Sequence, residues 1–474
     1  MNLKRVVAMV ESKIIFNVPG IIKVSKNEIC GKFLISTNTR NCTSDDVFVA
    51  LKGPSFDGFN FIKNAIEKKC SIIVYNHESK TVKVVENFIK QNPEVCFIGV
   101  ENTEKYLQLI AKSHAQSLRK NGKLKFVIGI TGSNGKTTTK NMLFHILSES
   151  LGDLVGGNIG SFNNHIGVPL TLLGLDEKKE VVIVEMGSNH PGEIKFLCDI
   201  AGPNAGIITN IGDAHLEFFR DKDGIFLEKR TLFDEVMDNT ENDGFFVTNA
   251  DDDYLKILPK KNNHLKSSVD NGDIKIDISR NTAVLKTEND CFELRNENIT
   301  GHHNFLNLSL SFLMAQMLYP SKMDTTLAAA STFKPTSNRS QWVDKWKKKI
   351  FLDAYNANPS SMIASVEAFL ARSESEGVNI GECLLILGDM NELGDESRKL
   401  HIELGKTLKK KGVKNPIFVG KHSCDYEFGY QLECKIFQST EKLVKNWKKI
   451  ISRYKYILIK GSRTLQLELL LDIN

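Results

Sequence analysis

Short apolar segments punctuated by glycine or asparagine alternate with stretches of helical periodicity along this 474-residue chain. Such alternation is typical of stacked strand-helix units and predicts an α/β fold. The predicted strands fall into three groups, and in chain order they cover residues 46–51, 71–75, 96–100, 126–131, 181–185, 206–210, 350–353, 384–388, 416–420 and 456–460. A helical stretch near 106–119 follows the first group.

The length and one polar segment refine this picture. A chain of 474 residues exceeds what one hydrophobic core usually serves, so two to four domains are expected. Residues 239–299 are polar and rich in loop-forming types, with weak alternation over 273–285. This segment predicts a small β excursion within the second group of strands.

The segment from Phe126 to Thr139 predicts a buried strand, a glycine loop and a helix start. Gly132 and Gly135 allow backbone N–H groups to surround phosphate oxygens, Lys136 supplies a cation, and a threonine hydroxyl can hold Mg²⁺. The loop is shorter than the common Walker pattern, because Ile130 stands where that pattern has a glycine. We predict a site for ATP or GTP, whereas a chance Gly-Lys-Thr turn is the structural alternative. The residues expected to contact the nucleotide are Gly132, Ser133, Asn134, Gly135, Lys136, Thr137 and Thr138.

Charge and cysteine content exclude several classes of protein. Sixty-two basic and 57 acidic side chains give a net charge of +5, too slight at this length to indicate a nucleic-acid partner. Nine scattered cysteines without a Cys-x-x-Cys pair suit reduced thiols. Residues 6–10 are too short an apolar run for a signal peptide, and no apolar stretch reaches membrane-spanning length. We therefore expect a soluble cytoplasmic enzyme.

Polar residues follow two predicted strands of the second group. Glu185 ends a strand of four β-branched residues, where a P-loop protein keeps the acid that holds Mg²⁺; a surface glutamate is the alternative. Asn210-Ile-Gly-Asp-Ala-His215 follows the next strand. A neutral His215 there is a candidate ligand for a second divalent ion, although a lone loop histidine is more often not a ligand.

Eight segments carry distinctive motifs in chain order: Gly129–Thr137, Phe162–Pro169, Glu185–Gly187, Asn210–His215, His303–Asn307, Tyr355–Pro359, Gly388–Gly394 and Lys460–Arg463. Together they resemble the Mur ligase family. The resemblance extends from Thr39-Arg40 to Arg463, and so many spaced motifs in one order are not expected by chance.

The resemblance implies three domains. These are an N-terminal UDP-sugar-binding domain at residues 1–106, a central domain with a P-loop-type ATPase sheet at 107–332, and a C-terminal Rossmann-like ligase domain at 333–474. It also implies an enzyme of peptidoglycan synthesis. No membrane insertion is expected, a monomer is the default expectation, and the sequence leaves the oligomeric state open. Within the family, Tyr355–Pro359 together with Gly388–Gly394 and Lys460–Arg463 resembles the branch that adds D-Ala-D-Ala to UDP-N-acetylmuramoyl-tripeptide. The resemblance implies that ATP is used and that the reaction passes through an acyl phosphate.

The same resemblance implies two Mg²⁺ sites. Thr137 and Glu185 serve the ion on the β and γ phosphates, and His215 serves the ion that bridges the γ-phosphate and the substrate carboxylate. Lys229 is the position of a lysine carbamylated by CO₂, which turns a cation into an anionic oxygen ligand. A surface lysine on a helix is the alternative.

The remaining site residues are also assigned by resemblance. Lys136, His215, Lys229 and Arg339 form the expected catalytic set. Asn304 and Asn307 are expected near the adenine, Arg339 at the phosphates and Asp353 on the ribose, although the two asparagines could instead cap a helix. Substrate contacts are expected from Arg40, Asn163, Asn164, Tyr355, Asn356, Asn358 and Lys460, of which Lys460 could instead face solvent.

Some residues depart from the family pattern. Thr37-Asn-Thr-Arg40 replaces the usual Asp-Ser-Arg, Ser161 replaces an asparagine, and Leu352 replaces an acidic residue. Asn338 stands before Arg339 where glycine is common, which affects the hinge. None of these changes removes a predicted metal or phosphate ligand.

Two other functions are alternatives to this ligase activity. A diamino-acid-adding Mur ligase or a folylpolyglutamate synthetase-like ligase shares the ATPase core, but the chain lacks the Asp-Asn-Pro tripeptide typical of the former. A nucleotide-binding switch would not need His215, Lys229 and Arg339 together. The identity of the tripeptide's third residue, lysine or diaminopimelate, is left open.

Overall fold

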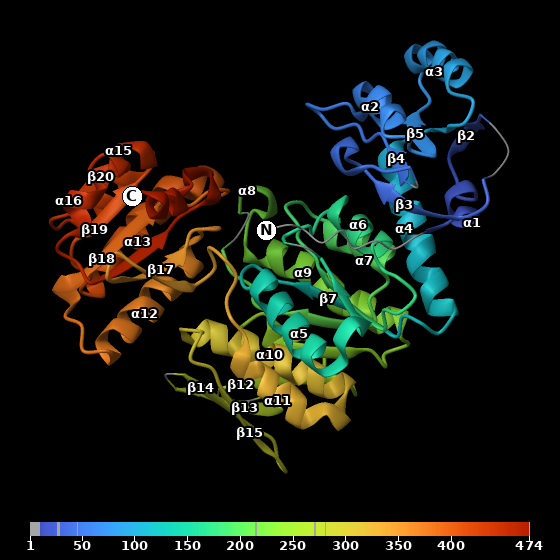
Figure 1. Ribbon diagram of the computed structural model, residues 1–474. Coiled ribbons are helices and arrows are strands. Elements are labelled where there is room, and N and C mark those ends of the chain that lie inside the picture. The colour runs from blue at the N-terminus through green and yellow to red at the C-terminus, as the bar shows by residue number, and fades with distance from the viewer. Residues whose placement is uncertain are drawn as a thin grey trace. The chain divides into compact units, whose positions relative to one another are not determined.

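The computed structural model describes residues 10–25, 29–44, 46–158, 160–213, 216–269, 272–279 and 281–473 (Figure 1). Two compact units make up the chain. The first comprises Met1–Gly129, Leu151–Gly187 and Glu193–Ala205, and the second comprises Ile130–Ser150, Ser188–Gly192 and Gly206–Asn474. The predicted domain boundaries at 106/107 and 332/333 stay predictions.

The N-terminal sheet of the first unit has six strands in the order β1-β3-β4-β5-β6-β2. The four strands from β3 to β6 in this order are parallel, and β1 and β2 are antiparallel to their neighbours. The strands are β1 (Val10–Glu11), β2 (Ile21–Val24), β3 (Lys32–Ser36), β4 (Asp46–Val49), β5 (Ile72–Asn76) and β6 (Cys96–Val100). The helices are α1 (Ser12–Phe16), α2 (Ile62–Glu67), α3 (Ser79–Gln91) and α4 (Thr103–Lys120).

Burial explains which of these strands the sequence predicted. Predicted strands 46–51, 71–75 and 96–100 correspond to β4, β5 and β6, whose apolar side chains Phe48, Ile73 and Phe97 form one core cluster. The exposed strand β2 has no such pattern and was missed.

A nine-stranded sheet has the order β15-β14-β13-β12-β11-β10-β7-β9-β8. Its strands are β7 (Phe126–Thr131), β8 (Val155–Gly157), β9 (Val181–Glu185), β10 (Ala205–Ile208), β11 (Phe245–Asn249), β12 (His264–Ser268), β13 (Ile274–Ser279), β14 (Thr282–Lys286) and β15 (Cys291–Arg295). The accompanying helices are α5 (Lys136–Leu151), α6 (Gly167–Leu173), α7 (Glu193–Ala201), α8 (Leu216–Phe219), α9 (Lys222–Asn239), α10 (His302–Leu318) and α11 (Met323–Thr332).

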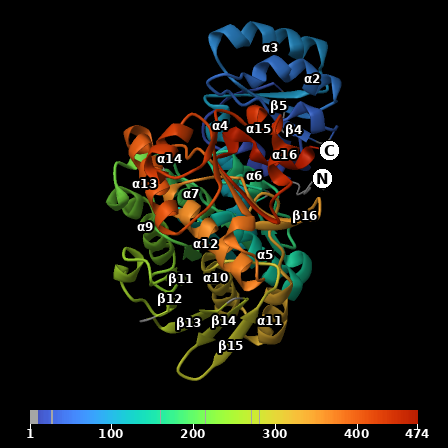
Figure 2. The same cartoon turned by 90° about the vertical axis from the view of Figure 1, so that its left-hand side faces the viewer.

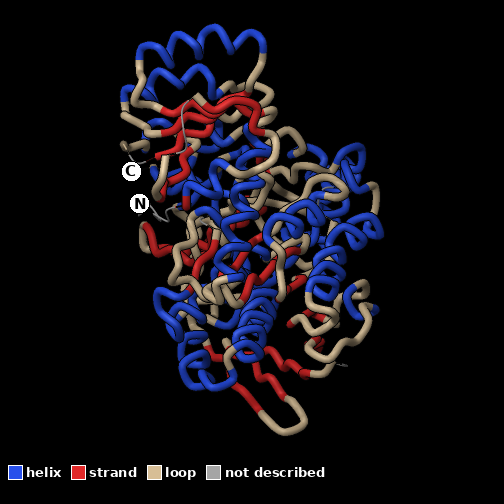
Figure 3. Tube along the Cα trace, turned by 90° about the vertical axis from the view of Figure 1, so that its right-hand side faces the viewer, coloured by secondary structure: helices blue, strands red, loops and turns tan. Residues whose placement is uncertain are grey.

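The predicted β excursion in residues 239–299 is confirmed. Strands β13, β14 and β15 form an antiparallel meander, with Ile276 opposite Leu285 and Leu285 opposite Phe292. The β14–β15 hairpin ends in a loop that extends away from the helices (Figures 2 and 3). Alternation with only one buried side explains why the sequence signal was weak.

The C-terminal sheet has the order β16-β17-β21-β18-β19-β20, parallel except for β16. Its strands are β16 (Gln341–Lys345), β17 (Lys348–Asp353), β18 (Cys383–Gly388), β19 (Pro416–Val419), β20 (Lys435–Phe437) and β21 (Tyr456–Lys460). The helices are α12 (Pro359–Ser375), α13 (Ser397–Lys410), α14 (Ser423–Tyr430), α15 (Thr440–Val444) and α16 (Trp447–Ile451).

This sheet is covered on both faces. Alternate residues of its central strands, such as Leu385 and Leu458, join a core with α12, α13 and α14. Their neighbours Leu384 and Ile457 join a second core with α15 and α16. A parallel sheet between two helical layers is the Rossmann-like arrangement that the sequence predicted (Figure 2). No helix in the described part of the chain is long and apolar enough to cross a membrane.

Candidate active site

The glycine loop lies between β7, which ends at Thr131, and α5, which begins at Lys136. Gly132 and Gly135 have φ angles of 143° and 81°, a region that side-chain-bearing residues rarely adopt. A Cβ atom on Gly132 would collide with the Thr209 hydroxyl. A Cβ atom on Gly135 would lie 2.9 Å from the Asn307 amide. Both glycines are therefore required by conformation and by close packing.

The segment after β10 holds the backbone of the loop. The Ser133 N–H donates to the Asn210 carbonyl at 2.9 Å, and the Gly212 N–H donates to Ser133 Oγ at 2.8 Å. The Asn210 side chain accepts from the Asn134 N–H at 3.0 Å and donates to the Asn134 carbonyl at 3.0 Å. In this segment the sequence predicted a functional role only for His215, and the hydrogen bonds from Asn210 to the loop were not predicted. An amide directly after a strand was the available signal.

Lys136 lies over the loop that it follows. Its Nζ donates to the Gly132 carbonyl at 2.6 Å and to the Ser133 carbonyl at 3.2 Å. Thr137 is buried and Thr138 is half-buried in the first turn of α5. Exposed N–H groups at a helix start, together with a lysine ammonium, form a site suited to phosphate.

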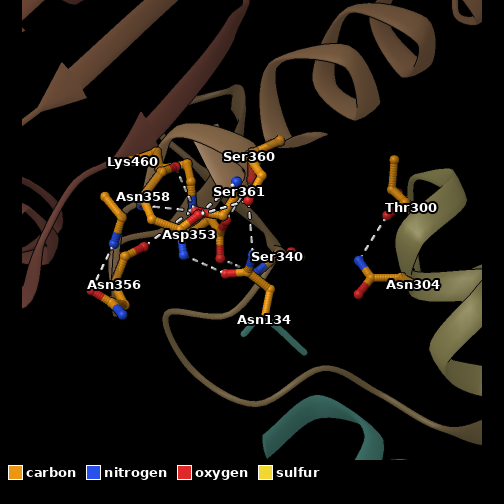
Figure 4. Close-up of polar contacts among 12 residues, drawn as sticks. Asn134, Thr300, Asn304, Ser340, Asp353, Asn356, Asn358, Ser360, Ser361 and Lys460 are labelled. Atoms are coloured by element: carbon orange, nitrogen blue, oxygen red, sulfur yellow. Dashed lines mark hydrogen bonds and ion pairs between the residues drawn. The ribbon is translucent and has the colours of Figure 1, made fainter. Parts of the chain in front are cut away.

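The two asparagines of α10 do not cap that helix, because its N-cap is Gly301. Asn304 donates to the Thr300 carbonyl at 2.8 Å (Figure 4). Asn307 is buried against Gly135. The capping alternative is therefore wrong, and Asn307 packs directly on the phosphate loop.

Lys229 is almost completely buried, with 1% of its surface exposed. Its Nζ donates to Ser188 Oγ at 2.5 Å and lies 5.7 Å from the centre of the Phe219 ring. The preceding residue, Glu228, accepts a 2.7 Å hydrogen bond from the Gly192 N–H. Consecutive residues of α9 thus hold both ends of segment 188–192. The surface-lysine alternative is wrong.

Two further predicted metal ligands are His215 and Glu185. His215 lies outside the described residues. Glu185, in the first unit, is buried and accepts from Asn163 Nδ2 at 2.8 Å, while its own N–H donates to Asn158 Oδ1 at 2.6 Å. Within the described ranges, no three His, Cys, Asp or Glu side chains gather as a metal site. The Mg²⁺ ligands remain predictions.

Three predicted substrate residues lie in the first unit. Asn163 bonds to Glu185. Asn164 Oδ1 accepts from the Gly167 N–H at 2.9 Å and so shapes the turn into α6. Arg40 is exposed, and its N–H donates to Asn38 Oδ1 at 3.1 Å. Asn38, one of the departures from the family pattern, therefore shapes the turn that presents Arg40.

At the carboxyl ends of β17 and β21, Asp353 and Lys460 form a buried ion pair. Lys460 Nζ lies 2.6 Å from Asp353 Oδ2, and Asp353 also accepts from Ser365 Oγ at 2.6 Å and from the Ser340 N–H at 3.0 Å (Figure 4). Burial alone would raise the pKa of Asp353, but the Lys460 ammonium and these donors outweigh it and lower that pKa. The solvent-facing alternative for Lys460 is wrong, since only 2% of its side chain is exposed.

Arg339 stacks on Tyr355, with the guanidinium carbon 3.8 Å from the centre of the ring. This cation–π contact holds the arginine flat against the loop that follows β17. Asn338 has a φ of 64°, a left-handed conformation that asparagine tolerates better than most residues. The replacement of the usual glycine by Asn338 thus preserves the backbone turn before Arg339.

The loop after β17 also contacts the phosphate loop. The Asn356 carbonyl accepts from Lys460 Nζ at 3.2 Å. Asn358 caps α12 by accepting from the Ser361 N–H, and its Nδ2 donates to Asn134 Oδ1 at 2.7 Å. The second unit therefore joins a phosphate loop, a buried lysine and an aromatic-stacked arginine in one body, a set suited to phosphoryl transfer.

Profiles of known families match most of the chain. The Mur ligase family catalytic domain matches residues 34–114, the Mur ligase middle domain matches 130–315, and the Mur ligase glutamate ligase domain matches 338–463.

Full-length relatives carry one activity name. UDP-N-acetylmuramoyl-tripeptide--D-alanyl-D-alanine ligase of Bacillus subtilis is 30% identical over 447 residues, covering 92% of this chain and 91% of the relative. The ligase of the same name from Escherichia coli is 28% identical and covers 92% of each chain.

Solved structures agree with these matches. MurF from Acinetobacter baumannii superposes with a TM-score of 0.83 at 26% identity and covers 98% of each chain. MurF ligase from Thermotoga maritima in complex with ADP has a TM-score of 0.75 at 25% identity and covers 93% of this chain and 96% of its own.

Proposed function

The chain belongs to the Mur ligase family, and we propose that it joins D-Ala-D-Ala to UDP-N-acetylmuramoyl-tripeptide, with ATP converted to ADP and phosphate. The proposal is carried by the end-to-end match to relatives of that single activity. The glycine loop, the Thermotoga maritima relative's ADP complex and the Rossmann-like domain support the use of ATP.

The chemistry explains why ATP is needed. A carboxylate is a poor electrophile, so its oxygen first attacks the γ-phosphorus, and the bond from that phosphorus to ADP breaks. The dipeptide amine then attacks the resulting acyl phosphate. Phosphate leaves with the C–O bonding electrons, and the amine loses one proton to a base. The products are the amide, ADP and phosphate.

Charge repulsion is the main obstacle in the first step. Two anions about 4 Å apart repel by roughly 4 kcal/mol at an effective dielectric constant near 20. Lys136, already placed over the glycine loop, and Arg339, held on Tyr355, are the described cations that would offset this repulsion. Their fixed positions reduce the reorganisation needed during reaction.

The predicted ligands suit the divalent ions that this family implies. Mg²⁺ prefers oxygen ligands, and Thr137, Glu185 and a carbamylated Lys229 would offer them, with His215 as the further ligand predicted from sequence. Lys229 is buried beside the Ser188 hydroxyl, and a carbamate at this position would present an anionic oxygen to a divalent ion that compensates its charge. When bound, Mg²⁺ would neutralise phosphate charge.

The other predicted residues would bind substrates. Arg40, Asn163 and Asn164 would contact the UDP-sugar peptide, while Asn304, Asn307 and Asp353 would contact the nucleoside. Tyr355, Asn356, Asn358 and Lys460 would form the region that receives the dipeptide. Because Lys460 is buried, it would act through the Asn356 loop that it holds. The nine cysteines are thiols rather than disulfides, which fits a reducing cytoplasm as the place of action.

The test is an ADP-release assay with Mg²⁺-ATP and UDP-N-acetylmuramoyl-tripeptide, with and without D-Ala-D-Ala, plus mass analysis of the sugar peptide. We expect release that depends on the dipeptide and a matching mass gain. Parallel reactions with lysine- and diaminopimelate-containing tripeptides identify the third residue. A gain of a free diamino acid by the dipeptide substrate instead would reassign the chain to the neighbouring ligase. Hydrolysis that ignores every acceptor would indicate a nucleotide-dependent switch.

A further inference from the structure

The side chain of Asn134 is fully engaged by the C-terminal domain. Its Oδ1 accepts from Asn358 Nδ2 at 2.7 Å, and its Nδ2 donates to Ser360 Oγ at 3.0 Å (Figure 4). Asn358 and Ser360 are the N-cap of α12 and a residue of its first turn. More than 220 residues separate these partners in the sequence.

The main chain of Asn134 is held by a different group. Its N–H and its carbonyl both bond to the Asn210 side chain, and Thr209 Oγ1 donates to the same carbonyl at 2.5 Å. The shape of the phosphate loop thus does not depend on the Asn134 side chain. That side chain can therefore fix the position of the C-terminal domain relative to the phosphate loop.

The loop that Asn134 contacts carries the platform for Arg339. Tyr355, on which the guanidinium stacks, lies three residues before Asn358. Lys460 holds the same loop through the Asn356 carbonyl, and Asn358 fixes it to α12 by a reciprocal bond with Ser361. A loop tied at these points transmits a displacement at Asn358 to Tyr355.

The packing leaves little tolerance at this contact. A Cβ atom on Gly212 would lie 3.1 Å from Ser360 Oγ and 3.5 Å from Asn134 Nδ2. Asn358 is buried, with 4% of its surface exposed. If the Asn134–Asn358 hydrogen bond were lost, a buried amide group would lose a hydrogen-bond partner at a cost in free energy, so the contact is specific.

We propose that Asn134 and Asn358 are positioning residues that place Arg339 over the phosphate loop by fixing the Tyr355 loop against it. The proposal rests on the proposed ATP-dependent ligation. It identifies a role for the phosphate-loop side chain beyond nucleotide binding: Asn134 links a docked C-terminal domain to the arrival of a cation at the transferring phosphoryl group.

The variant that tests this is Asn358→Ser. Serine is a good N-cap, so α12 keeps its first turn, but the shorter side chain cannot reach Asn134. The matched control is Asn379→Ser. Asn379 caps the short helix Ile380–Glu382, and its Oδ1 accepts from the Gly381 N–H. This helix directly precedes β18, so it lies at the amino ends of the parallel strands, whereas the β17 loop lies at their carboxyl ends.

The expected result separates binding from turnover. Asn358→Ser should leave the Kd for ADP unchanged and lower kcat about tenfold, the effect of one lost hydrogen bond worth about 1.4 kcal/mol. Asn379→Ser should retain wild-type kcat. In an Arg339→Ala background, Asn358→Ser should have no further effect, because its action passes through Arg339. Additive losses of kcat from Asn358→Ser and Arg339→Ala in the double variant would overturn the proposal. A wild-type kcat in Asn358→Ser would overturn it as well.

Hydrogen exchange supplies a readout that does not depend on the acceptor. Asn134→Ala should speed exchange in residues 354–361 while residues 132–135 stay protected by Asn210. If wild-type protein forms no amide product but this pattern holds, the ligation assignment fails and the Asn134–Asn358 coupling stands. Unchanged exchange in 354–361 would contradict the coupling itself.

Discussion

Lys460 Nζ lies 2.6 Å from Asp353 Oδ2, and the two residues end neighbouring parallel strands of the C-terminal sheet in direct register. Both are largely withdrawn from water, with 2% and 15% of their side chains exposed. A buried charge left without its partner is strongly destabilising, whereas replacing both partners is often tolerated. This pair therefore makes a clear prediction.

Asp353→Asn or Lys460→Met alone should lower the free energy of unfolding of the C-terminal domain by roughly 3–5 kcal/mol. The double variant should recover most of that loss. The three tryptophans of the chain, at 342, 346 and 447, all lie in this domain, so tryptophan fluorescence during denaturant titration measures it. Additive losses in the double variant would show that the two charges do not depend on one another.

Gly132→Ala should abolish nucleotide binding, because the added Cβ meets the Thr209 hydroxyl and the backbone has a φ of 143°. Gly122→Ala is the matched control: its φ is also positive, at 67°, but no atom lies within 4 Å of the added Cβ. The control should cost about 1 kcal/mol of stability and leave affinity unchanged. Titration calorimetry with ADP measures the affinity of both variants. Normal affinity in Gly132→Ala would contradict the tight packing of the loop.

Lys229→Met should remain folded and lose ligation. Methionine fills a similar volume but cannot form a carbamate, so the variant should stay folded while it loses the predicted metal ligand. Arg230→Met is the control, because the neighbouring Arg230 is partly exposed and pairs with Asp234 on the surface. ¹³C NMR with labelled bicarbonate should show a carbamate signal in wild-type protein and in Arg230→Met but not in Lys229→Met. Wild-type activity in Lys229→Met would remove Lys229 from the site.

His264 should make the central domain sensitive to acid. Its ring is fully buried against the rings of Phe233 and Phe246, and burial lowers its pKa to about 4. The unfolded chain therefore takes up this proton at higher pH than the folded protein. Stability should be fully present above about pH 6.5 and fall by at most roughly 1.4 kcal/mol per pH unit towards pH 4.

The control for this pH dependence is His264→Gln, which can keep the bond to Thr248 but does not titrate. Hydrogen exchange of β11 and β12, measured between pH 7 and pH 4.5 and corrected for intrinsic rates, reports the stability of these strands. That stability should fall towards pH 4.5 in wild-type protein and fall less in the variant. Equal acid sensitivity in both would assign the effect to other groups.

Local sequence determined the elements whose signals are contained in a few consecutive residues. Runs such as Val181–Val184 must be buried strands, and Gly132 to Thr137 can form a phosphate loop wherever a strand precedes it and a helix follows. The missed strands β2, β3, β16 and β20 are partly or largely exposed, so burial imposed no continuous apolar pattern on them, whereas β1 and β8 were missed because they are only two and three residues long. Family resemblance added the order of the domains and the assignments of site residues.

Only the tertiary structure decided the environments of the polar side chains. From sequence, Lys229 and Lys460 had plausible solvent-facing alternatives, yet both are buried because α9 packs over segment 188–192 and β21 lies in the middle of its sheet. The Asn134–Asn358 bond depends on the docking of two distant segments, and no local preference specifies it. Strand periodicity is a short-range consequence of burial, whereas the partner of a polar group is set by which surfaces meet when the whole chain has folded.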